Sequence, residues 1–204
     1  ACAALHSHAT KQTHIVHQVH PQGVAVVVNR LKPEQPRRLV ITGASSGLGF
    51  ALTRHYLARG AIVAAIARRG ELLQPLSAEF PNQVFCYPLD VRDAVAMQHA
   101  AQDFIARVGN PDVVIANAGV SVGTLTEYSE DVVPFQQLMD INVLGMVKTF
   151  QPFVAAMREA RKGTLVGIAS VAGFRGLPGA GAYSASKAAA ISSLESLRVE
   201  LRSS

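Results

Sequence analysis

A tyrosine and a lysine four positions apart, Tyr183 and Lys187, have the types and spacing to do chemistry. Residues i and i+4 share one face of a helix, so the two side chains can lie side by side. A phenol with an ordinary pKa of about 10 is seldom ionised at neutral pH, and a nearby ammonium group lowers that pKa. The pair could act as a general acid and base, or it could be only the exposed face of a helix.

A glycine-rich segment, TGASSGLG at residues 42–49, could bind phosphate. It follows an apolar run and precedes a helical pattern, which is the context that a phosphate-binding turn requires. Glycine lets the backbone turn sharply and approach a pyrophosphate closely, and the helix behind it offers free N–H groups and a positive dipole end. The alternative is a tight turn between strand and helix that binds nothing.

Two arginines follow the next apolar run. In dinucleotide-binding folds an acid about 20 residues after the glycines holds the ribose of NAD, whereas an arginine accommodates the 2′-phosphate of NADP. This chain has Arg68 and Arg69 there, and the nearest acid, Glu71, begins the next predicted helix. A guanidinium can bind phosphate through two hydrogen bonds. We therefore expect NADP(H), with NAD(H) less favoured; the alternative is that both arginines lie on a solvated loop.

Strands and helices alternate five times along the chain around these residues. Short apolar runs rich in branched residues predict buried strands, and helical spacing of apolar residues predicts the segments between them as helices. Such an alternation forms a parallel sheet with helices on both faces, so we predict an α/β fold with a doubly wound, Rossmann-like parallel sheet and three α/β/α layers. The predicted strands are 38–44, 61–67, 83–91, 112–119 and 163–170, and the predicted helices are 46–60, 70–80, 92–109, 133–161 and 183–203.

Length, composition and charge exclude several classes of protein. The 204 residues are 49% hydrophobic and 16% charged, which suits a globular domain with a sizeable core. The net charge of +5 includes no basic stripe with interleaved aromatic residues, so we expect no nucleic-acid partner. No apolar run approaches 18 residues, so we expect no membrane span. Cys2 and Cys86 lie far apart, which argues against a disulfide framework and favours a cytoplasmic protein.

Residues 1–37 differ from the rest of the chain. Their histidines could suggest a metal site, but the spacing matches no recognised ligand pattern, so we expect no metal. We predict a poorly ordered N-terminal extension over 1–37, in which GVAVVV at 23–28 could add a short strand, and a dinucleotide-binding and catalytic domain over 38–204. The histidines of this region are His6, His8, His14, His17 and His20.

The chain resembles the single-domain short-chain dehydrogenases/reductases. The matching segments are TGASSGLG, LDV, NAG, IN, IAS and YSASK, which occur in the family's order across residues 38–204. The resemblance implies catalytic roles for Asn142, Ser170, Tyr183 and Lys187. It implies cofactor contacts for Gly43, Ser45, Ser46, Gly47, Leu48, Gly49, Arg68, Asp90, Val91, Asn117, Ala118, Gly119, Tyr183 and Lys187.

The resemblance also implies a reaction, in which hydride passes between NADP(H) and a carbonyl or secondary alcohol. Tyr183 would exchange a proton with the substrate oxygen, and Ser170 would hydrogen-bond that oxygen. Lys187 would bind the nicotinamide ribose, and Asn142 would support a water molecule and the lysine. Relatives often form dimers or tetramers through the helices that carry Asn142 and Tyr183, so we expect a homodimer or homotetramer.

The chain departs from the family at its end. It stops at Ser204, whereas relatives continue into further strands and a segment that covers the substrate. We therefore expect the C-terminal strands to be missing, with an exposed sheet edge and an incomplete substrate pocket. A second hypothesis is a catalytically silent, truncated module that binds nucleotide or self-associates. The intact Ser170, Tyr183 and Lys187 favour the enzyme, and the shortened end favours the silent module.

Overall fold

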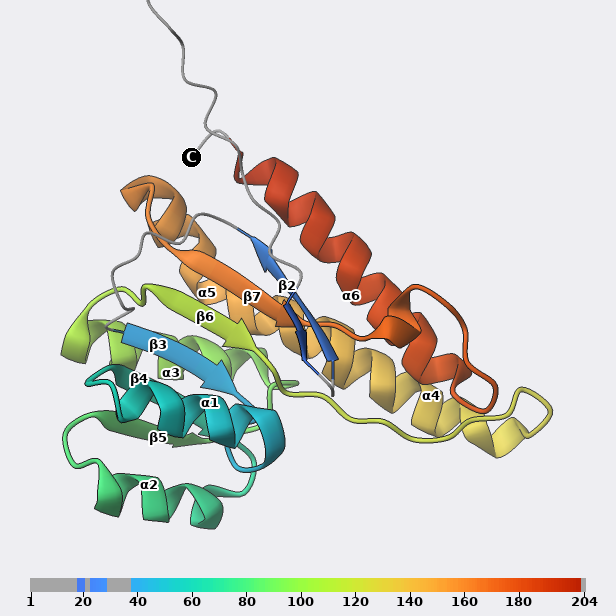
Figure 1. Cartoon of the computed structure of the whole chain (residues 1–204), viewed down its shortest axis with the longest axis horizontal. Helices are drawn as coiled ribbons and strands as arrows, with labels where there is room; N and C mark the ends of the chain where they lie inside the picture. Colours follow the sequence, from blue (N-terminus) through green and yellow to red (C-terminus); the bar gives the residue numbers. More distant parts are fainter. Residues whose placement is uncertain (1–17, 21–22, 29–37, 203–204) are drawn as a thin grey trace, which may run out of the picture.

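The backbone of the protein is built around one seven-stranded sheet (Figure 1). The structure, a computed structural model, describes residues 18–20, 23–28 and 38–202. In spatial order the strands run β1, β2, β7, β6, β3, β4, β5, and β3 to β7 are parallel. The strands are β1 (Gln18–His20), β2 (Gly23–Val28), β3 (Arg38–Thr42), β4 (Ile62–Ala67), β5 (Val84–Pro88), β6 (Val113–Ala116) and β7 (Thr164–Ile168).

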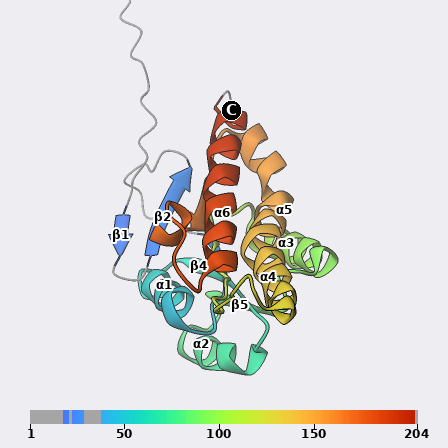
Figure 2. The same cartoon turned by 90° about the vertical axis from the view of Figure 1, so that its right-hand side faces the viewer.

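Helices cover both faces of the parallel strands, as the sequence predicts (Figure 2). From β3 the chain moves outward through β4 and β5 on one side and through β6 and β7 on the other, so the sheet is doubly wound. Helices α1 and α2 pack on one face, and α3, α5 and α6 pack on the other. The helices are α1 (Gly47–Leu57), α2 (Gln74–Glu79), α3 (Ala94–Val108), α4 (Val132–Met139), α5 (Gly145–Ala160) and α6 (Gly181–Glu200).

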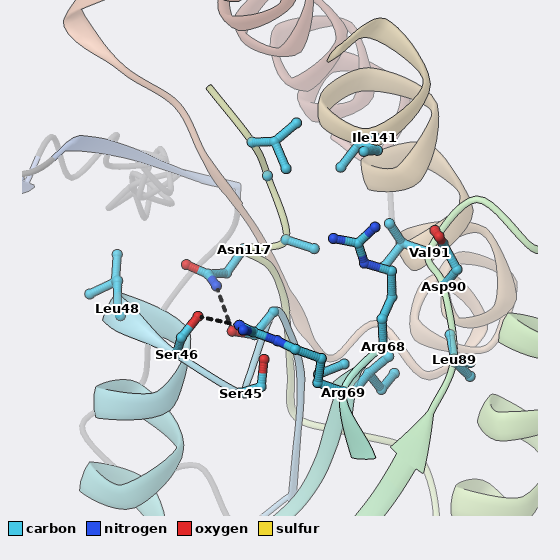
Figure 3. A pocket seen from close by; sticks show the side chains of 17 residues that line it. Ser45, Ser46, Leu48, Arg68, Arg69, Leu89, Asp90, Val91, Asn117 and Ile141 are labelled. Atoms are coloured by element: carbon cyan, nitrogen blue, oxygen red, sulfur yellow. Dashed lines mark hydrogen bonds between the residues drawn. The ribbon is translucent and has the colours of Figure 1, made fainter. Parts of the chain in front are cut away.

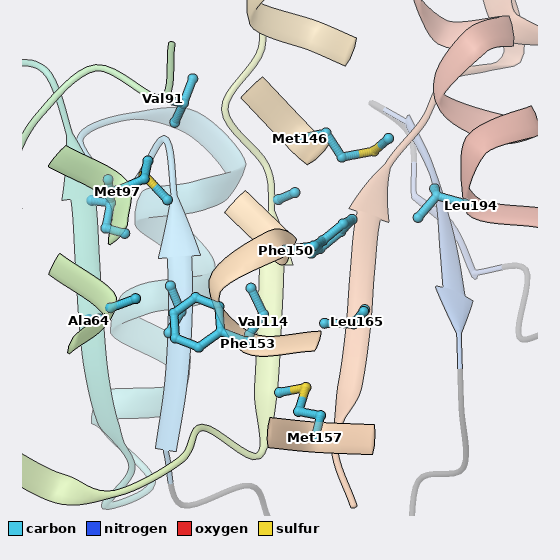
Figure 4. Close-up of a cluster of buried hydrophobic side chains, with 14 of the residues drawn as sticks. Ala64, Val91, Met97, Val114, Met146, Phe150, Phe153, Met157, Leu165 and Leu194 are labelled. Carbon is cyan, nitrogen blue, oxygen red and sulfur yellow. The ribbon is translucent and has the colours of Figure 1, made fainter. Parts of the chain in front are cut away.

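Two apolar cores follow from the alternation of side chains along the strands. Val40 and Val114 face one core, which also contains Phe104 of α3. Figure 4 shows Phe150 and Phe153 of α5 filling the space over the sheet in this core. The neighbouring strand residues face the second core under α1 and α2. Because both faces of the central strands are buried, these strands need the continuous apolar sequences by which they were predicted.

Two predicted helices differ in detail from the structure. The run predicted as one helix over 133–161 contains a π-helical turn, η3 (Asp140–Leu144), between α4 and α5, and this turn carries Asn142. The run predicted over 70–80 divides into a 3₁₀ turn, η1 (Gly70–Leu73), and α2. Pro75 lies in the first turn of α2, where its missing N–H costs no helical hydrogen bond.

The expectation of an exposed sheet edge beside β7 is wrong for the described residues. Strand β2 pairs antiparallel with β7, from Ala25 opposite Ile168 to Val28 opposite Leu165, and β1 pairs with β2. The short strand expected at 23–28 is therefore present and satisfies the backbone groups of β7.

Most of residues 1–37 lie outside the described residues, including His6, His8, His14 and His17. The poorly ordered extension therefore stays a prediction. Within the described ranges, no group of three or more histidine, cysteine or acidic side chains could hold a metal ion. Of the helices in those ranges, none combines the length and apolarity needed to cross a membrane.

Candidate active site

A cavity of ≈ 390 Å³ lies at the carboxyl ends of β3, β4, β5 and β6 (Figure 3). This is where the strand order reverses, which is the usual ligand position in open α/β sheets. Every cofactor residue predicted above lines the cavity except Gly49, Tyr183 and Lys187. The lining also includes residues that were not among the predicted cofactor contacts: Ile66, Ala67, Arg69, Leu89, Val120 and Ile141.

The glycine turn forms one wall of the cavity, and two of its glycines have a backbone that other residues rarely adopt. Gly43 has φ +69° and Gly47 has φ +53°. A Cβ on Gly43 would lie 2.8 Å from Nδ2 of Asn117. Gly49 lies beneath the turn, and a Cβ there would be 2.3 Å from the carbonyl oxygen of Gly43. The turn is therefore shaped by glycine at all three positions.

Hydrogen bonds from the end of β6 hold the glycine turn in place. The hydroxyl of Thr42 accepts from the backbone N–H groups of Asn117 and Ala118, both at 3.1 Å. The Asn117 side chain donates to the carbonyl of Thr42 at 2.9 Å. Asn117 thus links β6 to β3 as well as lining the cavity. Thr42 begins the TGASSGLG segment, but its supporting role was not predicted.

Positive charge gathers on the side of the cavity where β4 ends. Figure 3 shows the two arginine side chains diverging, Arg69 toward Ser46 and Arg68 toward Val91. Arg69 donates from Nη2 to the Ser46 hydroxyl at 3.5 Å. The Ser46 side chain does not cap helix α1, so it leaves the first N–H groups of α1 to other acceptors. These glycines, arginines and the helix N-terminus are the donor set that fits a dinucleotide phosphate.

The carboxylate of Asp90 lies on the same side of the cavity and is held by Arg92. Arg92 donates to it from Nη2 at 2.7 Å and from Nε at 3.1 Å. The hydrogen bonds from Arg92 hold the pKa of Asp90 below its ordinary value, and the charge of Arg68 adds to this effect. The Asp90 side chain is therefore ionised at neutral pH and forms part of the cavity wall.

Tyr183 and Lys187 lie together on α6, as their spacing predicts. The lysine Nζ is 5.7 Å from the centre of the tyrosine ring and donates to the carbonyl of Ile168 at 2.7 Å. Lys187 is only 6% exposed, and burial lowers its pKa to about 8. Tyr183 is half-buried, and its hydroxyl forms no hydrogen bond with another described residue. The phenol can therefore meet a substrate while the ammonium group stays near it.

Ser170 and Asn142 belong to segments that pack against α6. Ser170 follows β7, and its Oγ accepts from the N–H of Ala172 at 3.2 Å. The Asn142 side chain bonds to Val120 and Ser186. Its expected support of a water molecule and of Lys187 stays a prediction. Ser186 lies inside the YSASK segment, but nothing in the sequence singled it out.

Gly119 lies between the cavity and the side chains of Asn142 and Lys187. It lines the cavity, and a Cβ on it would lie 3.2 Å from Oδ1 of Asn142 and 3.7 Å from Nζ of Lys187. One residue therefore borders both the predicted cofactor site and the residues predicted to do chemistry. A ligand that extended along the cavity past Gly119 would reach the side chains of α6.

Comparison with known proteins shows the family to which the chain is similar. A family model described as short chain dehydrogenase matches residues 37–204. The 2-dehydro-3-deoxy-L-rhamnonate dehydrogenase (NAD(+)) of Sphingomonas sp. is 38% identical over 165 residues, which are 81% of this chain and 66% of that protein. The NADP-dependent 3-hydroxy acid dehydrogenase of Escherichia coli K12 is 31% identical over 74% of this chain and 60% of its own length. The chain thus spans about two thirds or less of these relatives.

Solved structures show the same fold. A short-chain dehydrogenase from Streptomyces avermitilis superposes with a TM-score of 0.77 and 35% identity, covering 84% of this chain and 62% of that one. An alcohol dehydrogenase from Thermococcus sibiricus, complexed with 5-hydroxy-NADP, superposes with a TM-score of 0.71 and 27% identity. It covers 81% of this chain and 72% of its own.

Proposed function

The chain belongs to the short-chain dehydrogenase family, and on that premise we propose that it transfers hydride between NADP(H) and a carbonyl or secondary alcohol. The observation that carries the proposal is the position of Gly119 between the cavity and the side chains of Asn142 and Lys187. The cavity is lined with groups that suit phosphate, and Tyr183, a possible proton donor, lies on the same helix as Lys187 beside it. This arrangement suits a reaction between a bound dinucleotide and a second molecule.

The cavity residues divide the binding of the dinucleotide among them. Gly43 and Gly47 let the backbone approach the pyrophosphate, and the N-terminus of α1 faces its charge. Arg68 binds the 2′-phosphate. Arg69, which is hydrogen-bonded to Ser46, places a second positive charge beside the glycine turn. The relatives named above include one NAD(+) and one NADP enzyme, so the preference for NADP(H) rests on these two arginines. When bound, the nicotinamide supplies or takes up the hydride.

The residues at the end of β7 and on α6 handle the proton. In reduction, hydride adds to the carbonyl carbon while Tyr183 gives its proton to the carbonyl oxygen, which yields the alcohol. Ser170 donates a hydrogen bond to the same oxygen and holds it toward Tyr183. The ammonium group of Lys187 stabilises the phenolate that remains. In oxidation the steps run backwards, and Tyr183 acts as the base.

We also propose that the chain assembles as a homodimer or homotetramer through α5 and α6. A groove of ≈ 570 Å³ between these helices is lined by apolar side chains such as Val147, Val154 and Leu197. Val147 is 44% exposed, so a second copy would bury it. We expect Val147→Glu to reduce the molar mass measured by light scattering to that of a monomer.

The test of the reaction is transfer of deuterium from 4-deuterated NADPH to a panel of ketones and aldehydes, followed by mass spectrometry. We expect label at the carbinol carbon of at least one product. Tyr183→Phe should lower kcat about 10³-fold and leave the Kd for NADPH within about twofold. Tyr128→Phe, which alters an exposed tyrosine, is the control and should leave both unchanged. An unchanged rate for Tyr183→Phe would overturn the assignment of the acid.

A further inference from the structure

We propose that Ser186 is a positioning residue that holds the tyrosine–lysine turn of α6 against the wall of the cofactor cavity. The inference rests on the proposed function. Ser186 lies between Tyr183 and Lys187 in the sequence and is fully buried. Its Oγ donates to the carbonyl of Tyr183 at 2.8 Å and accepts from Nδ2 of Asn142 at 3.0 Å. The hydroxyl thus joins the backbone of the tyrosine to the π-helical turn η3.

Asn142 carries the connection on to the cavity. Its Oδ1 accepts from the N–H of Val120 at 2.9 Å, and its Nδ2 donates to the carbonyl of Val120 at 2.9 Å. Both hydrogens of the amide group are therefore used, one on Val120 and one on Ser186. Val120 lines the cavity. A chain of hydrogen bonds, of which the one between Asn142 and Ser186 is buried, links Val120, Asn142, Ser186 and the backbone of Tyr183.

Removal of the Ser186 hydroxyl breaks this chain at one point. Asn142 is only 4% exposed, so its freed N–H would have no water to bond and would favour another orientation of the amide. The segment at Val120 and the turn of α6 would then no longer be linked through Asn142. Because reaction rates depend steeply on the placement of the reacting groups, a small displacement of Tyr183 slows proton transfer.

The test compares Ser186→Ala with Ser184→Ala. Ser184 is a buried serine of the same helix, but its hydroxyl accepts from the N–H of Leu177 at 3.3 Å and does not contact Asn142. We expect Ser186→Ala to lower kcat about tenfold with a Kd for NADPH within about threefold, and to change the pH profile of kcat. Ser186→Cys, which keeps the size and a weak hydrogen-bonding group, should recover part of the rate. Ser184→Ala should leave the pH profile unchanged.

A second measurement does not depend on activity. In ¹H–¹⁵N spectra, Ser186→Ala should shift the side-chain amide of Asn142 and the backbone amide of Val120, and Ser184→Ala should shift neither. If the wild-type chain transfers no hydride, the proposed function fails, and the spectra alone decide whether Ser186 is linked to Val120. Unshifted resonances, or an active Ser186→Ala variant with the kcat and pH profile of Ser184→Ala, would overturn the inference.

Discussion

The cavity at the carboxyl ends of the strands and the tyrosine–lysine turn of α6 are held in place by different means. The cavity is shaped by backbone: a turn with positive φ at Gly43 and Gly47 and strand ends tied by Thr42. The α6 turn is held by side chains, with Lys187 bonded to a carbonyl and Ser186 bonded to Asn142. Substitutions in the glycine turn should therefore cost folding free energy. Substitutions on α6 should change protonation, and with it the pH dependence of stability, as well as the rate of reaction.

Burial has opposite consequences at the two places. At the base of the glycine turn the buried backbone groups are neutral and hydrogen-bonded: the carbonyl of Thr42 accepts from Asn117, and the N–H of Ala44 donates to the carbonyl of Ile66. Their burial therefore carries no penalty for charge. Lys187, in contrast, brings an ionisable group into the interior, where its Nζ donates to the carbonyl of Ile168. The buried charge of Lys187 thus lowers stability while it keeps a cation beside Tyr183. Such destabilised charges are typical of sites that perform acid–base chemistry.

The largest effect on stability that separates the two regions is the pH dependence that Lys187 causes. Burial lowers its pKa from 10.5 to about 8. As the pH falls below 10.5 the unfolded lysine takes up a proton first, so the unfolded state binds more protons until about pH 8. The contribution of Lys187 to stability therefore falls by up to about 3 kcal/mol over this window and stays constant below it.

Urea unfolding of the wild type and Lys187→Met at several pH values measures this contribution. The free energy of unfolding of the variant, relative to wild type, should be higher by up to about 3 kcal/mol at pH 7.5 than at pH 10.5. Lys148→Met is the control, because Lys148 is only half-buried, unlike Lys187, and donates to the carbonyl of Arg92. A difference that does not change with pH would show that Lys187 is not desolvated in the fold.

The next effect concerns the glycine turn and is steric. Gly49→Ala would place a Cβ 2.3 Å from the carbonyl oxygen of Gly43, which is backbone and cannot rotate away. We expect a loss of about 2–3 kcal/mol of stability, in the range for overpacked sites, together with weaker NADPH binding. Gly176→Ala is the matched control, since no atom lies within 4 Å of its Cβ. Equal melting temperatures for the two variants would contradict the description of the turn.

Much of the fold follows from local sequence, and the exceptions have a common cause. The parallel strands and the glycine turn were predictable because their apolar runs and glycines act on the backbone nearby. The pairing of β2 with β7 joins residues about 140 positions apart, and no local pattern specifies such a pairing. The partners of Asn142 and Ser186 likewise depend on how η3 packs against α6. Their residue types indicate hydrogen bonding but not the partner.

The most direct test of the account is binding of NADPH and NADH to the wild-type chain and to Arg68→Asp, measured by nicotinamide fluorescence. We expect NADPH to bind more tightly than NADH. Arg68→Asp should weaken NADPH binding about tenfold or more, because a charge-assisted hydrogen bond is lost, and should change NADH binding little. Arg161→Asp makes the same charge change at the exposed end of α5 and should leave both affinities unchanged. A folded chain that binds neither nucleotide would contradict the central claim, and equal loss in the two variants would contradict the role of Arg68.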